Sequence, residues 1–287
     1  MGGGGMSSAP PSLRLIPPSP IPLPSLPMLR ALRTAALGMA AQQAAVDNTA
    51  NNLANANTTG FKRTRVAFQD LLYQRVRAAG GEDGAAPPAS LQLGHGALAT
   101  ATIGTFTQGS LTETGNALDM AVNGDGFFAV QRPDGSRSYT RDGTFTLTAE
   151  GQVVTASGFA LDPGIEVPPD ALDLQVLSDG TVRALLPGEA EPVELGQIEL
   201  VRFQNPAGLR ALGGNLFAQT EASGEPVVAP PGEDGLGTVL QGVLEASNVD
   251  VVQEMVALIE SQRAYELNSK MVQAGEEMLQ IANGVKR

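Results

Sequence analysis

Apolar side chains near the start of the chain follow a helical spacing. Between Leu29 and Leu53 they recur every three or four residues and are interrupted only at Gln43, which predicts a helix with a narrow, alanine-rich apolar stripe. The stripe consists of Leu29, Leu32, Ala36, Met39, Gln43, Val46, Ala50 and Leu53. The helix propensity is lowered by Asn48, Asn51, Asn52, Asn55 and Asn57. We therefore expect the helix to end near residues 55–57, with Gly60 supplying a left-handed conformation beyond it.

The end of the chain returns to a helical period. Its apolar residues stand at strict seven-residue intervals, at Val251, Leu258, Tyr265, Val272 and Leu279. This heptad spacing predicts a helix of about 35 residues, capped by Asn248 or Asp250 and followed by Gly284. At ~1.5 Å per residue the helix would span roughly 50 Å, far beyond the average helix of a globular protein.

The middle of the chain has the shorter period of β-strands. Turn dipeptides such as Asp134-Gly135 and Asp142-Gly143 recur every seven or eight residues, with β-branched and aromatic runs between them. This pattern predicts a β-meander, followed by strands near residues 172–177, 181–186 and 198–203. The expected fold class is therefore α+β, with two long terminal helices paired as a coiled-coil-like layer and a central all-β domain.

Composition divides the chain into five segments. Residues 1–27 are Gly-rich and then Pro-rich, which argues against a helix or a packed strand and predicts a disordered extension. An alternative is that the natural chain starts at Met28. We then expect a helical segment over 28–73, an extended linker over 74–105, the β domain over 106–238 and the C-terminal helix over 239–287.

The residue inventory argues against catalysis. The 287 residues include no cysteine and one histidine, His95, so thiol chemistry, disulfides and cysteine-ligated metals are excluded and a histidine metal site is disfavoured. We predict no enzyme activity, no catalytic residue, no cofactor and no metal. The net charge of −12 argues against a nucleic-acid partner. No run approaches the ~18 apolar residues that membrane insertion requires.

Charge is unevenly distributed between the two ends. Residues 28–77 contain seven basic residues against Asp47 and Asp70, whereas residues 245–285 contain seven acidic residues against Arg263 and Lys270. The two regions could attract one another, within a subunit or between subunits. The simpler alternative is that both are solvated helix faces.

Neither terminal helix has an obvious partner except the other. Both stripes could be covered inside one copy, by the other helix or by the β domain. Alternatively, the helices stack with neighbouring copies, and a heterologous contact that does not close propagates as an open filament. In that case we expect the ends to be partly disordered in the monomer and to fold on assembly.

Several blocks of the chain resemble the bacterial flagellar rod and hook proteins. The signature-like segment 51–62 reads NNLANANTTGFK, and residues 109–130, 140–158 and 240–272 are also similar to that family. Residues 68–74, 91–94 and 205–209 most resemble its distal-rod members. Together these blocks span essentially all of residues 28–287. Family members begin at the residues matching Met28, so residues 1–27 depart from the pattern.

This resemblance implies a structural subunit that self-assembles into the flagellar distal rod, which crosses the periplasm and transmits torque to the hook. It implies export by the flagellar type III apparatus without a cleaved signal peptide. The implied partners are further copies of the chain, other rod proteins, the hook or hook-junction side, the surrounding bushing rings and the export apparatus. It also implies that the terminal helices form the inner layer of the tube and that residues 74–105 stiffen it.

Other interpretations stay open at this point. The chain could be a proximal rod or hook protein of the same family, a secreted oligomeric β-domain adhesin, or a small hydrolase built on an aspartate pair or a serine. The segment containing Asn55, Thr59, Gly60, Phe61 and Lys62 could be an export or assembly determinant, or simply a helix stop; we expect both roles. The apolar stripes of the two helices are the expected assembly seams.

Overall fold

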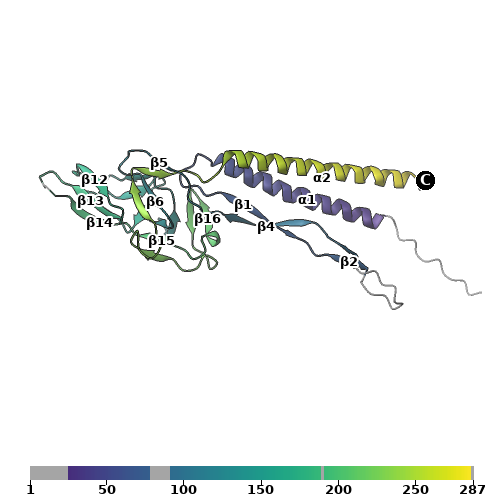
Figure 1. Ribbon diagram of the computed structural model, residues 1–287, viewed down its shortest axis with the longest axis horizontal. Helices are drawn as coiled ribbons and strands as arrows, with labels where there is room; N and C mark the ends of the chain where they lie inside the picture. The colour runs from purple at the N-terminus through teal and green to yellow at the C-terminus, as the bar shows by residue number, and fades with distance from the viewer. Residues whose placement is uncertain (1–24, 78–90, 189–190, 286–287) are drawn as a thin grey trace, which may run out of the picture.

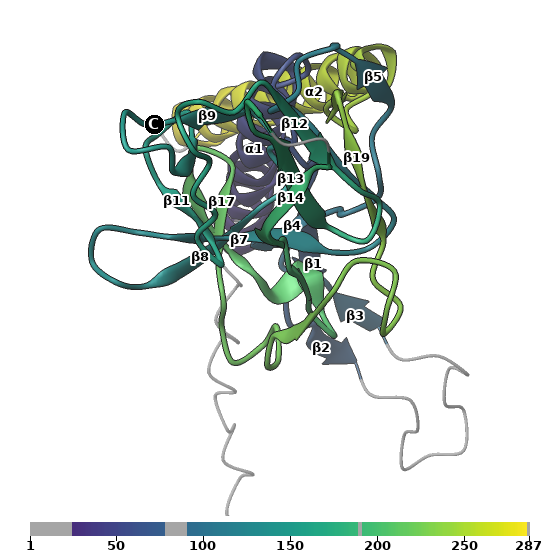
Figure 2. The same cartoon turned by 90° about the vertical axis from the view of Figure 1, so that its left-hand side faces the viewer.

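The computed structural model describes residues 25–77, 91–188 and 191–285. A β domain lies at one end of the molecule, and two helices and a β-ribbon lie side by side at the other (Figure 1). Helix α1 (Ser25–Ala54) runs toward the β domain and α2 (Val251–Val285) runs away from it. In both views α1 lies between α2 and the ribbon (Figures 1 and 2). The α+β class expected from the sequence is confirmed.

Helix α1 begins upstream of its expected start and ends where expected. It includes Ser25 to Pro27, which composition alone had argued against; residues 1–24 of the expected extension lie outside the described residues. Pro27 fits the first turn because the backbone N–H groups there have no intrahelical acceptor. After the helix, Gly60 has φ +67°, and a Cβ there would stand 2.6 Å from the backbone nitrogen of Asp142.

Helix α2 has the predicted length of 35 residues. Its N-cap is Asp250, whose carboxylate accepts hydrogen bonds from the backbone N–H groups of Val252 (2.9 Å) and Gln253 (3.2 Å). Asn248, the other candidate cap, has a different role described below. Gly284 lies inside the last turn of the helix and not beyond its end.

A β-ribbon occupies much of the region expected to be an extended linker. Its first strand lies inside the segment 28–73 that was expected to be helical, because the β-branched and aromatic residues Thr64, Val66 and Phe68 favour a strand. Its strands are β1 (Thr64–Asp70), β2 (Gln74–Arg77), β3 (Leu91–Leu93) and β4 (Ala97–Gly104). Strand β1 pairs antiparallel with β4, and β2 pairs with β3. Residues 78–90, whose composition predicts a flexible connection, lie outside the described residues. The ribbon runs along α1, and the Arg30 guanidinium donates a hydrogen bond to the side chain of Gln74 (2.9 Å).

The β domain is built around a nine-stranded sheet. Its main path runs β16-β17-β8-β7-β11-β10-β9, and β15 pairs with both β7 and β18. These strands are β7 (Phe127–Gln131), β8 (Arg137–Thr140), β9 (Phe145–Leu147), β10 (Val153–Thr155), β11 (Ala160–Asp162), β15 (Leu200–Arg202), β16 (Arg210–Gly213), β17 (Leu216–Ala218) and β18 (Val227–Ala229). A short 3-10 helix, η1 (Pro206–Gly208), precedes β16.

Smaller sheets complete the domain. A three-stranded sheet contains β12 (Asp173–Val176), β13 (Thr181–Leu185) and β14 (Val193–Gln197). Two further pairs join distant parts of the chain: β5 (Leu111–Glu113) with β20 (Val243–Glu245), and β6 (Met120–Asn123) with β19 (Thr238–Gln241). Because β20 leads directly into α2, these pairs tie the start of that helix to the domain.

The predicted strands are present, but the predicted meander order is wrong. Strands β7 and β8 form a hairpin and so do β9 and β10, yet β8 does not continue into β9. Strand β11 lies between β7 and β10 instead. The connection after β8 is diverted because Arg141 turns into a buried polar cluster and the carbonyl of Gly143 accepts a hydrogen bond from the N–H of Met120 (3.0 Å).

The core of the domain lies on both faces of β7. Phe128 packs with Phe145, Leu161 and Leu200 on one face, and Phe127 packs with Phe203 on the other. Successive side chains of a strand point to opposite faces, so the consecutive phenylalanines serve two separate clusters. Burial on both faces explains why the first four residues of this strand, 127–130, are all apolar.

Replacement Phe128→Ala removes the central ring of the larger cluster and should lower the free energy of unfolding by about 3–5 kcal/mol. The measurement is urea denaturation followed by far-UV circular dichroism. The control is Leu172→Ala, because Leu172 is 69% exposed and its loss leaves no cavity. Equal effects of the two replacements would contradict the assignment of the core.

Candidate functional site

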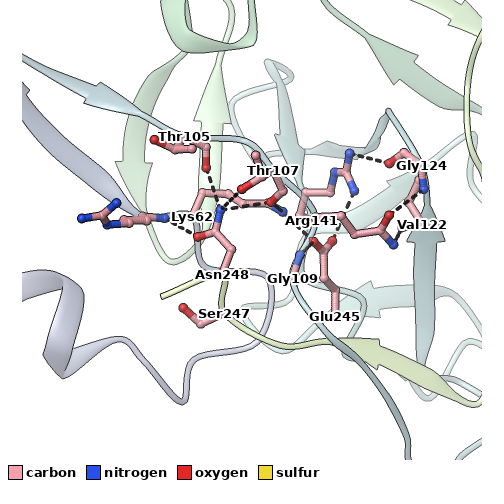
Figure 3. A network of polar contacts seen from close by, with 12 residues as sticks. Lys62, Thr105, Thr107, Gly109, Val122, Gly124, Arg141, Glu245, Ser247 and Asn248 are labelled. Atoms are coloured by element: carbon pink, nitrogen blue, oxygen red, sulfur yellow. Dashed lines mark hydrogen bonds and ion pairs between the residues drawn. The ribbon is translucent and has the colours of Figure 1, made fainter. Parts of the chain in front are cut away.

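A buried ion-pair cluster lies where the helices meet the β domain. We call Lys62, Arg141 and Glu245 the Glu245 cluster (Figure 3). The Lys62 Nζ atom is 2.5 Å from one carboxylate oxygen of Glu245, and the Arg141 Nη1 atom is 3.2 Å from the other. The three side chains are at most 3% exposed. One carboxylate therefore faces two cations in a setting that excludes water.

Backbone groups supply further hydrogen bonds to this cluster, although the buried Nε atom of Arg141 has no hydrogen-bond partner. The N–H of Gly109 donates to Glu245 (2.8 Å), Lys62 donates to the carbonyl of Thr107 (2.9 Å), and Arg141 donates to the carbonyl of Gly124 (2.8 Å). The Arg141 guanidinium also lies over the ring of Phe127, 5.3 Å from its centroid. Thr107 and Gly109 share one loop and Gly124 lies on another, so together with the segments of Lys62, Arg141 and Glu245 the cluster joins five separate segments.

Burial sets the electrostatics of the two cations. It lowers the pKa of the Lys62 ammonium, and the neighbouring Glu245 carboxylate opposes that shift. The pKa of the Arg141 guanidinium is lowered for the same reason, again with Glu245 opposing. The pairing with Glu245 thus offsets part of the cost of burying positive charge at this junction.

A second polar group links the end of α1 to the ribbon and to α2. The amide of Asn52 donates to the carbonyl of Thr64 (2.7 Å) and to Glu254 (3.1 Å), and its oxygen accepts the Thr64 N–H (3.0 Å). Asn48, one turn earlier, also donates to the carbonyl of Thr64 (2.8 Å). Glu254 is paired with Arg63 as well. The first turn of α2 is therefore bound to both α1 and the ribbon.

Asn248 connects the two groups. Its side-chain oxygen accepts the N–H of Arg63 (2.7 Å), and its amide donates to the carbonyls of Thr105 (2.9 Å) and Thr107 (3.0 Å) (Figure 3). This residue thus holds the chain after α1 against the chain after β4, at the point where α2 is about to begin. We call the Glu245 cluster, together with the polar groups around Asn52 and Asn248, the joint.

The five predicted turn residues all lie at or beside this joint. Gly60 donates its N–H to the carbonyl of Glu245 (2.8 Å), and the carbonyl of Thr59 accepts from Asn215 (2.9 Å). Asn55 caps the turn by accepting from the hydroxyl of Thr58 (3.2 Å). Phe61 is half-buried beside them, and Lys62 enters the Glu245 cluster.

Several polar and small residues of α2 contact α1. Glu254 binds Asn52, Asn268 lies against Gly38, and Leu32 approaches within 2.7 Å of where a Cβ on Gly275 would stand. Glu254, Asn268 and Gly275 share one heptad position. Of the predicted seam residues, Leu32, Met39, Val46, Leu53, Leu258, Val272 and Leu279 are half-buried, whereas Leu29, Val251 and Tyr265 are exposed.

Much of the apolar surface of α2 has no partner within the described residues. Eight of its apolar side chains are between 49% and 70% accessible. They are Val252, Met255, Val256, Ile259, Leu267, Met271, Met278 and Ile281, which we call the apolar face of α2. Exposed apolar surface of this extent on one element marks a site of association.

Three family models match consecutive parts of the chain. They are described as flagella basal body rod protein (residues 32–62), flagellar hook protein FlgE/F/G D1 domain (121–184) and flagellar basal body rod FlgEFG protein C-terminal (240–285). The flagellar basal-body rod protein FlgG of Borreliella burgdorferi is 46% identical over 91% of this chain and 100% of its own length.

The chain belongs to the flagellar basal-body rod protein family. The FlgG proteins of Caulobacter vibrioides and Bacillus subtilis are 46% and 38% identical over 90% and 91% of this chain, and the alignments span both relatives completely. This rod protein is a structural subunit of the flagellar basal body and not an enzyme. The comparisons favour the rod interpretation over the adhesin and hydrolase alternatives.

Among the described residues, no group of three or more His, Asp and Glu side chains could hold a metal ion. Neither α1 nor α2, as described, combines the length and the apolar character that crossing a membrane requires. The joint fixes the directions in which the helices and the ribbon of this rod subunit leave the β domain.

Sequence reasoning identified Lys62 but missed its partners in the rod subunit. Glu245 and Arg141 gave a weak signal, because each is a charged residue at the end of a short strand. Asn48 and Asn52 were read as residues that weaken the helix, although they stand one turn apart on one face. Such spacing is what two amides need to bind the same backbone group.

Replacement Glu245→Gln keeps the shape of the side chain but leaves Lys62 and Arg141 buried without a counter-charge. We expect a loss of about 3–5 kcal/mol in the free energy of unfolding, measured by urea denaturation. The control is Glu233→Gln, since Glu233 is exposed and should change stability by less than about 0.5 kcal/mol. If both variants unfold at the same urea concentration, the cluster does not hold the joint.

Proposed function

We propose that this rod subunit polymerises through α1 and α2 into the distal rod, the straight tube that crosses the periplasm and transmits torque to the hook. The single observation that carries the proposal is the apolar face of α2, which lies uncovered along a helix of 35 residues. Fully burying one such side chain contributes about 1.5–3 kcal/mol, so contacts between copies would be strongly stabilised.

The helix pair would act as a coiled-coil-like inner layer. The seam of a single copy is completed only in part, because Leu29, Val251 and Tyr265 remain exposed while Leu258 and Val272 are half-covered. Exposed and half-covered side chains at the edge of the seam would become more buried when another copy packs beside it. A contact of α2 with a different surface of the next copy is heterologous, and repeated contacts of that kind produce an open helical polymer.

The ribbon offers a second surface for stiffening the tube. It exposes Phe68, Leu72, Tyr73, Leu93 and Leu98, with Leu72 being 89% accessible. The ribbon is hydrogen-bonded to α1 near the start and near the end of that helix. An apolar contact between the ribbon and another copy would therefore transmit bending force directly to the helix pair. This supports the stiffening role inferred for residues 74–105.

The remaining partners follow from the same arrangement. With the helices inside the tube, the β domain faces outward, toward the surrounding bushing rings. The ends of the polymer would meet other rod proteins and the hook or hook-junction side, and the subunit would reach the rod through the flagellar export apparatus without a cleaved signal peptide. The relative FlhP of Bacillus subtilis, named a flagellar hook-basal body complex protein, is 30% identical over 90% of this chain.

Electron microscopy of the concentrated, purified subunit tests the proposal, and open-ended rods are the expected result. Replacement Ile259→Asp should abolish these rods, because a carboxylate would be buried without a partner in the contact between copies. The monomer should keep its circular dichroism spectrum and its unfolding midpoint, since Ile259 is 49% exposed.

The matched control is Leu172→Asp, which places the same charge on an exposed apolar position of the β domain. Rods should form from this variant at the same protein concentration as from the unchanged subunit. Closed rings or trimers, or normal rods from the Ile259 variant, would contradict polymerisation through the apolar face of α2.

A further inference from the structure

An open groove lies between the first turns of α1, the far half of α2 and the ribbon. Its volume is about 480 Å³, and its floor and walls are largely apolar. The lining residues are Arg30, Ala31, Arg33, Thr34, Ala35, Leu93, Gly94, His95, Asn268 and Met271. This volume accommodates several side chains of a partner. We call it the basic groove because of its charged residues.

The charge of the basic groove has one sign. Arg30 and Arg33 stand on its rim, and none of the described residues that line it is acidic. Arg30 donates to the neutral side chain of Gln74, and neither arginine forms an ion pair within the described residues. An apolar groove with unpaired cations at its edge fits an amphipathic segment that carries carboxylates.

The far end of α2 has the complementary character. Between Lys270 and the helix end at Val285, α2 contains Glu276 and Glu277 and no basic residue, while Lys286 and Arg287 follow it in the sequence. Neither glutamate forms an ion pair within the described residues. Beside them the apolar side chains of Met278 and Ile281 are 51% and 68% exposed. Leu32 faces Gly275, and α2 ends beyond the point where α1 begins (Figure 1).

We propose that the basic groove of one copy receives the far end of α2 from a second copy, with Arg33 facing Glu276 or Glu277 across the contact. Met278 and Ile281 would bury their side chains against the apolar floor. This proposal rests on the polymerisation proposed above and names one of its contact surfaces. Since groove and helix end are different surfaces, the contact is heterologous and repeats along the polymer.

Segments of the same chain fit the groove less well. Residues 1–24 contain a single charged side chain, Arg14, which has the same sign as the rim of the groove. Residues 78–90 contain Glu82 and Asp83 but, unlike the end of α2, no large apolar side chain. The helix end combines both features that the groove requires, and the test below separates contacts within a copy from contacts between copies.

The test uses charge reversal in two separate copies. Variant Arg33→Glu places a carboxylate in the groove, and variants Glu276→Lys and Glu277→Lys each place a cation on the helix end. We expect Arg33→Glu and at least one of the two lysine variants to raise the concentration needed for assembly by about tenfold or more, because like charges then meet across each contact. Sedimentation and electron microscopy give the readout.

The deciding experiment mixes the two kinds of variant in equal amounts. Every contact in an alternating polymer joins opposite charges, so the mixture should assemble at nearly the concentration of the unchanged subunit. A contact within one copy would gain nothing from mixing, because each molecule would keep its own mismatch. The control Glu233→Lys carries an equal charge change in the β domain; it should assemble alone and should not rescue Arg33→Glu.

Each result has a clear meaning. If the unchanged subunit assembles and Arg33→Glu assembles equally well, or if neither lysine variant rescues it in the mixture, the basic groove proposal is overturned while the polymerisation proposal stands. If the unchanged subunit forms no rods at any concentration, the polymerisation proposal fails, and the groove proposal fails with it.

Discussion

The carboxylate of Glu245 holds together parts of the chain that are far apart in sequence. It binds Lys62 from the turn after α1 and Arg141 from the end of β8, and its own strand leads directly into α2. Because a buried charge that loses its partner is very unfavourable, these segments are held in one arrangement. A buried ion-pair cluster is a poor source of net stability compared with apolar packing, but it is highly selective for geometry. In a subunit that must present its helices in one direction, geometry is what assembly requires.

This joint separates two regions with different kinds of packing. On one side the β domain covers its apolar residues internally, around Phe127 and Phe128. On the other side the helices and the ribbon leave theirs exposed, along α2 and at Phe68 and Leu72. Force applied to the helices reaches the β domain through hydrogen-bonded, buried groups and not through a flexible linker. A rod that transmits torque needs that connection in every subunit.

The elements could be predicted from the sequence more fully than their contacts. The heptad spacing of α2, its Asp250 cap and the glycine at position 60 depend on local rules, and each was predictable from neighbouring residues. The order of the sheet was not, because β11 inserts between β7 and β10 for reasons of long-range packing. The joint could not be predicted from the sequence for a similar reason. Lys62 and Glu245 are separated by 183 residues, and nothing local indicates that they meet.

The composition of the α1–α2 contact fits the proposed assembly through the helices. Within one copy α2 presents Glu254, Asn268 and Gly275 to α1, whereas its large apolar side chains are half-buried or exposed. A seam of small and polar residues is selective but weak, whereas leucines and isoleucines in those positions would have made the monomer more stable and left little to drive polymerisation. Near the joint, Asn52 and Arg63 secure the first turn of α2; farther along, the helices rely on shape alone. Support for the helix pair in a single copy therefore decreases away from the β domain, and the uncovered region is where another copy has the most apolar surface to bury.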